Sequence, residues 1–124
     1  MGCDIHGFID YPRYQGPRSC VAALHLARNY DLFALLAGVR TRDAMKEYAP
    51  VFQPRGLPHD LTEWVAEQFD EDAHTPSWLT TDEVGHVLKV YDAVSPYPRG
   101  ADTDGLLAMM QALPDARLIF WFDN

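Results

Sequence analysis

The sequence predicts an α+β fold, in which a small antiparallel sheet is packed by three or four helices. Two observations lead to this class. Strand-like segments lie near both ends of the chain, at residues 3–11, 20–27 and 117–122, and the segments between them carry helical signals. The chain has 124 residues, of which 48% are hydrophobic and 23% are charged, so we expect a single domain over residues 1–124.

The first predicted strand, residues 3–11, begins almost at the N-terminus and continues into a hairpin. Side chains alternate between the two faces of a strand, so one face would carry Cys3, Ile5 and Ile9, and the other Asp4, His6, Phe8 and Asp10. A turn near Gly16 would return the chain along residues 20–27. Paired residue numbers would then sum to roughly 30, so Cys20 should face Asp10 and no disulfide to Cys3 is expected.

Capping signals predict the helices in the middle of the chain. Asn29 or Asp31 would begin a buried helix over residues 30–37, which Gly38 would end. Residues 41–60 contain three prolines and are predicted to form a long loop with one helical turn near residues 42–48. Asp60 and Glu63 have capping-box spacing, which predicts a short helix from Asp60 to Phe69.

The second half of the chain is predicted in the same way. Residues 70–77 are polar and are expected to form a loop. Thr80 and Glu83 form a capping box, which predicts a helix to about Val94, and Thr103 would cap another over residues 104–112. Residues 117–122 are apolar on both faces, as expected of a strand in the interior of the sheet.

Charge and composition exclude some classes of function. The net charge of −8 disfavours general DNA or RNA binding, because an acidic chain repels the phosphate backbone. No apolar run is long enough for a membrane span, and two unpaired cysteines suit a reducing cytoplasm. Eight of the ten basic residues are arginine, which suits bidentate capture of anions, although a GC-rich genome would also enrich arginine.

Polar side chains outside the helices suggest a binding site for a small anionic ligand such as a nucleotide. Arg40 and Arg55 would hold the anionic group and Trp78 would stack on a base. The orientation of the ligand would be fixed by hydrogen bonds from the remaining polar residues, namely Asp4, His6, His59 and His74. We expect such a protein to act without a cofactor, and it could form a homo-oligomer.

Two other classes of function stay open from the sequence. Asp4, His6, His59 and His74 could instead hold a divalent transition metal in a metal-dependent hydrolase or phosphoesterase. No HExxH motif or paired CxxC spacing supports that alternative. A third class is a protein–protein inhibitor that binds a host factor through a surface patch.

Four motifs resemble a group of small proteins encoded by phages and prophages. The motifs are MGCDIH (1–6), YDLFALLAGVR (30–40), RGLPHDL (55–61) and HTPSWLT (74–80). The resemblance covers most of the chain, including the final FWFDN, and implies an accessory protein made in the cytoplasm of an infected bacterium. It brings no established activity. Some small phage proteins sequester nucleotide signals of host immunity, so the resemblance favours binding of a nucleotide or an ADP-ribose-like signal.

Overall fold

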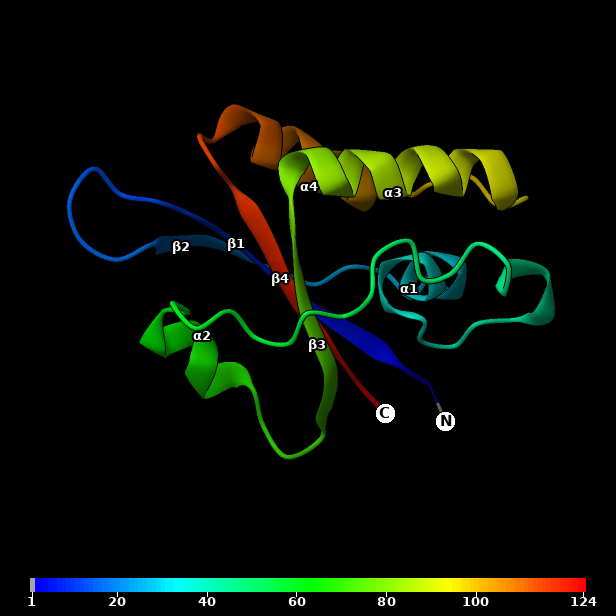
Figure 1. The fold of residues 1–124 in the computed structure, drawn as a ribbon, viewed down its shortest axis with the longest axis horizontal. Coiled ribbons are helices and arrows are strands. Elements are labelled where there is room, and N and C mark those ends of the chain that lie inside the picture. The colour runs from blue at the N-terminus through cyan, green and yellow to red at the C-terminus, as the bar shows by residue number, and fades with distance from the viewer. Residues whose placement is uncertain (1) are drawn as a thin grey trace.

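The computed structural model describes residues 2–124 and shows a four-stranded antiparallel sheet with the strand order β2-β1-β4-β3 (Figure 1). The strands are β1 (Asp4–Tyr11), β2 (Ser19–Leu24), β3 (Ala73–Thr80) and β4 (Arg117–Asp123). The helices are α1 (Tyr30–Ala37), the 3-10 helix η1 (Asp43–Met45), α2 (Glu63–Gln68), α3 (Thr81–Val94) and α4 (Ala101–Ala112). The predicted α+β class is confirmed.

Strand β4 lies inside the sheet, between β1 and β3, as its apolar sequence predicts. Leu118, Phe120 and Phe122 point into the larger core, which α1, α3 and α4 also line. Ile119 and Trp121 point to the opposite face, where α2 and the preceding loop cover a smaller core. Both faces of β4 are therefore buried, and the two cores share one sheet.

Helices α1 and α3 begin and end where their local signals predict. The side chain of Asn29 accepts a hydrogen bond from the backbone N–H of Leu32 at 3.1 Å, and Gly38 ends α1 with a φ of 74°. Thr80 and Glu83 form the full capping box at the start of α3. These boundaries are confirmed because each depends on residues within four positions of the helix end.

Four predicted boundaries are wrong. Strand β2 ends at Leu24 and does not continue to residue 27. Residues 70–77 are predicted to form a loop, but residues 73–77 belong to β3 (Ala73–Thr80), because the second edge of β4 takes its backbone partners from this segment. Helix α2 begins at Glu63 with Thr62 as its cap, because Asp60 instead pairs with Arg117 at 2.8 Å. Helix α4 begins at Ala101, and Thr103 is a buried residue of its first turn.

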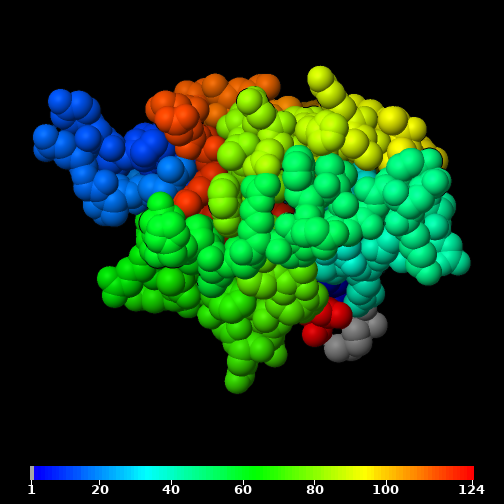
Figure 2. Space-filling view, viewed as in Figure 1, coloured from blue at the N-terminus to red at the C-terminus, as the bar shows by residue number. Residues whose placement is uncertain are grey.

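The β1–β2 hairpin has the predicted register. Asp10 pairs with Cys20, and both cysteines are free thiols. The turn between the strands projects from the body of the molecule (Figure 2), and Tyr14 within it is 99% exposed. Within residues 2–124, no helix has both the length and the apolar character needed to cross a bilayer.

Candidate functional site

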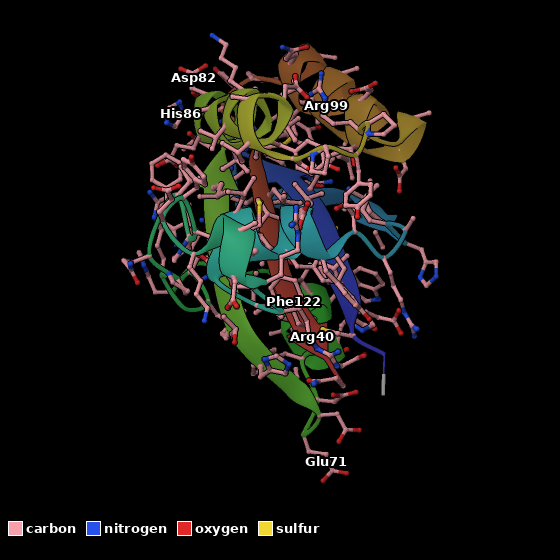
Figure 3. The ribbon with its side chains drawn as sticks, turned by 90° about the vertical axis from the view of Figure 1, so that its right-hand side faces the viewer. Arg40, Glu71, Asp82, His86, Arg99 and Phe122 are labelled. Carbon is pink, nitrogen blue, oxygen red and sulfur yellow. The ribbon has the colours of Figure 1, made fainter. Side chains whose placement is uncertain are left out.

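The residues predicted to form one site separate into two groups along the β3–β4 pair. Arg55 and Trp78 lie near the start of α3, where β3 ends. In Figure 3, Arg40 and Phe122 both lie away from Asp82, which is at the start of α3. The strand register places three further residues near Phe122, namely Asp4, His6 and His74. The prediction that all of them line one cavity is therefore wrong.

Asp4 and His6 already have charged partners within the fold. The Arg28 guanidinium donates to both Asp4 oxygens, at 2.7 and 3.2 Å, and lowers the pKa of the Asp4 carboxyl. The Nε2 atom of His6 contacts the Asp123 carboxylate, and its ring stacks 6.4 Å from Trp121. The His6 contacts join β1 to β4, and the Arg28–Asp4 pair joins β1 to the segment that precedes α1.

His74 and Arg40 lie on the other face of the same sheet end. His74 pairs with Phe122, whose side chain points into the larger core, and its Nδ1 lies 2.9 Å from the Thr75 hydroxyl. The Arg40 guanidinium lies 5.3 Å from the centre of the Tyr30 ring. Strand β4 therefore separates His74 from His6.

The alternative metal ligands do not gather at one point. His6 and His74 face opposite sides of the sheet, and His59 is exposed beside Asp60. Across residues 2–124, no three side chains of histidine, cysteine, aspartate or glutamate are grouped so that they could hold a metal ion.

Arg55 fastens the long loop to the free edge of β3. Its Nη1 donates to Glu83 at 2.7 Å and to the Trp78 carbonyl at 3.1 Å, and its guanidinium lies 4.7 Å from the centre of the Trp78 ring. Arg55 lowers the pKa of Glu83 from its usual 4.5 to about 2. The backbone N–H groups of Arg55 and Gly56 bond to Ser77 and Pro76. Arg55 is thus a structural clamp beside Trp78.

A buried ionic network, which the sequence did not reveal, lies at the same end of the sheet. Arg117 donates to Asp10 from Nε and Nη2 at 2.9–3.2 Å, and Arg18 donates to Asp10 from Nε at 2.9 Å. Asp10 is fully buried, while Asp60 meets Arg117 from the opposite side and has its carboxyl pKa lowered by that contact. The network could not be predicted because it depends on the β1–β4 register, which places Arg117 opposite Asp10.

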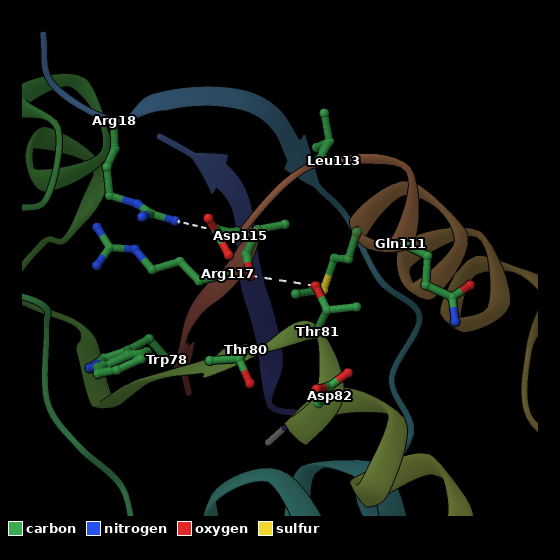
Figure 4. Close-up of a pocket in the computed structure, with 11 residues that line it drawn as sticks. Arg18, Trp78, Thr80, Thr81, Asp82, Gln111, Leu113, Asp115 and Arg117 are labelled. Atoms are coloured by element: carbon green, nitrogen blue, oxygen red, sulfur yellow. Dashed lines mark hydrogen bonds between the residues drawn. The ribbon is translucent and has the colours of Figure 1, made fainter. Parts of the chain in front are cut away.

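These arginines border a cavity of about 500 Å³ between the end of β3, the start of α3 and the end of α4 (Figure 4). Its charged side chains are two arginines and two aspartates, Arg18, Arg117, Asp82 and Asp115. Trp78 supplies an aromatic wall, and Gln111 supplies an amide. Of the residues predicted from the sequence to bind ligand, Trp78 lines this cavity.

A second cavity, also of about 500 Å³, lies where α1 and α4 begin. Each of its arginines donates two hydrogen bonds, from Nε and Nη2, to one aspartate. Arg28 donates to Asp4, and Arg42 donates to Asp31. Its aromatic residues are tyrosines. The cavity beside Trp78 is the one that combines two arginines with an indole ring.

Comparisons with protein-family models, with curated proteins and with solved structures found no match to this chain.

Proposed function

We propose that this protein binds a small molecule with an anionic group and a flat ring, such as a nucleotide, in the cavity beside Trp78. One observation carries the proposal: two guanidinium groups and an indole line the same cavity of about 500 Å³. Cavities of roughly 300–1,000 Å³ are typical of sites for small ligands and cofactors.

The positions of the two arginines suit recognition of an anion. Arg18 and Arg117 share the buried Asp10 carboxylate. Arg117 also pairs with Asp60 through Nη1, and Arg18 also donates to the Asp115 carbonyl from Nη2, so both guanidinium groups are held in place before any ligand arrives. A binding site that is already ordered loses less conformational entropy on binding. Guanidinium groups also form strong, directional hydrogen bonds to phosphate and carboxylate oxygens. The anionic group of the ligand would therefore lie at the arginine side of the cavity.

The proposed site includes Trp78, as predicted from the sequence. Its anion-binding pair is Arg18 and Arg117, in place of the predicted Arg40 and Arg55. Arg55 would act indirectly, since it packs against the Trp78 ring. In the setting that the resemblance to phage and prophage proteins implies, binding of this kind would sequester a nucleotide or an ADP-ribose-like signal from host immunity.

Thermal-shift and tryptophan-fluorescence measurements with a panel of nucleotides test the proposal. A ligand at one hundred times its Kd stabilises the folded protein by about 2.7 kcal/mol. Trp78→Leu and Arg18→Met should each abolish that stabilisation. Trp64→Leu and Arg13→Met are the matched controls and should retain it, because both residues are exposed and neither lines the cavity.

Two results would count against the site. If no nucleotide at millimolar concentration produces a thermal shift, the protein does not bind nucleotides. If the Trp64 and Trp78 variants lose the stabilisation equally, the ligand does not bind in the cavity beside Trp78.

A further inference from the structure

The cavity beside Trp78 has two chemically different sides. Figure 4 shows Arg18, Arg117 and Trp78 on one side, with Asp82 and Gln111 on the other. Asp82 is exposed and belongs to the first turn of α3, and Gln111 is exposed near the end of α4. Two successive helices, α3 and α4, therefore place an acceptor and an amide opposite the guanidinium groups.

We infer that Asp82 selects ligands that carry free sugar hydroxyl groups, so that the anion proposed above is a ribonucleotide or a ribose-phosphate derivative. The inference rests on the proposed binding of a nucleotide in this cavity. An ionised carboxylate repels phosphate because both groups are negatively charged. It can only accept hydrogen bonds, so it pairs with hydroxyl donors. An acidic side chain that binds the ribose hydroxyls is a recurrent device of dinucleotide-binding sites.

The charge balance of the cavity supports this choice over a bare polyanion. Its lining carries two arginines and two aspartates, so the formal charges of the lining cancel. Asp115 lies beside Arg18, which donates to its carbonyl at 2.8 Å, and Asp82 lies on the opposite side (Figure 4). Inorganic phosphate would be attracted at the arginine side and repelled by Asp82 on the opposite side. A ribonucleotide can present its phosphate to the arginines and its hydroxyls to Asp82, which satisfies both sides of the cavity.

Asp82 also stabilises α3 through its position in the first helical turn, where a negative charge is favourable. The test must therefore measure selectivity between ligands, which a helix-stabilising role leaves unchanged. Asp92→Asn is the matched control, because Asp92 lies on the same helix, the substitution changes the charge equally, and the residue lies outside the cavity.

Calorimetric titrations compare four ribonucleoside monophosphates, their 2′,3′-dideoxy analogues and inorganic phosphate. A hydrogen bond to a charged group supports a preference of about tenfold or more. We expect the wild type and Asp92→Asn to prefer the best ribonucleotide over its dideoxy analogue by at least that factor. In Asp82→Asn the preference should fall below about threefold.

The outcomes separate this inference from the proposed function. If ribo and dideoxy forms bind equally, and Trp78→Leu abolishes both, the cavity binds nucleotides but Asp82 does not select hydroxyls. A preference that persists in Asp82→Asn, or inorganic phosphate that binds as tightly as the nucleotides, also overturns the inference. If no nucleotide binds at all, the proposed function fails, and the inference fails with it.

Discussion

Replacement of Asp10 by asparagine is the most direct perturbation of the buried ionic network. Asp10 is fully buried, and its carboxylate accepts hydrogen bonds from both Arg117 and Arg18. Asparagine keeps the size of the side chain but removes the charge that both guanidinium groups share. The two arginines would then face each other across a neutral amide, close to the proposed binding cavity.

The expected cost follows from the burial of the partners. Removal of one member of a buried ion pair typically costs about 3–5 kcal/mol, because the other charge is left uncompensated. Arg117 keeps a second partner in Asp60, and the Arg18 side chain is 18% exposed, so water can reach it. We therefore expect a loss near the lower limit, about 3 kcal/mol.

Urea denaturation followed by circular dichroism measures this loss of unfolding free energy directly. Thermal unfolding gives a second measurement: for a chain of 124 residues, 1 kcal/mol corresponds to about 4 °C in Tm, so the Tm of Asp10→Asn should be about 12 °C lower. Asp43→Asn is the control, since it breaks the exposed Asp43–Lys46 pair and should cost less than about 1 kcal/mol. A loss below about 1 kcal/mol for Asp10→Asn would show that the network does not stabilise the fold.

Two further predictions concern acid stability and helix glycines. Because Arg55 lowers the pKa of Glu83 from 4.5 to about 2, their pairing stabilises the fold above about pH 4.5 and is lost as the pH falls towards 2. Urea titrations at about pH 5 and about pH 2.5 should therefore show a smaller acid-induced loss for Glu83→Gln than for the wild type, and equal losses would refute the assignment. Gly38 has a φ of 74°, so Gly38→Ala should lower the free energy of unfolding by about 1–2 kcal/mol. Gly85→Ala, within α3 and with no atom within 4 Å of the added Cβ, should raise that free energy by about 0.5–1 kcal/mol. If both glycine variants change the stability in the same direction, the conformational argument is wrong.

Features encoded locally could be predicted from the sequence. The caps of α1 and α3 lie within four residues of the hydrogen bonds they make, and the apolar run of β4 specifies its place inside the sheet. The role of Asp60 could not be predicted in this way. Its carboxylate has cap-like spacing to Glu63, but the fold brings Arg117 to it from 57 positions later in the chain. A long-range ion pair outweighed a local capping signal.

The position of Trp78 could not be predicted for a different reason, because an extra residue in β3 changes which face its side chain occupies. His74 pairs with Phe122 and Ser77 pairs with Phe120, so three steps along β3 match two steps along β4. Thr75, with a φ of 53°, lies within this bulge. In a regular strand His74 and Trp78 would share a face, since side chains alternate with a period of two.

The bulge instead separates His74 from Trp78 and sets Trp78 on the same face as Arg117. Trp78 pairs with Ile119, which points to the smaller core, and Thr80 pairs with Arg117 two positions further along β4. The indole and the guanidinium therefore meet at the cavity, while the imidazole of His74 stays with Phe122 on the opposite face. The extra residue in β3, which strict alternation does not predict, therefore places Trp78 on the face of Arg117 and leaves His74 on the opposite face.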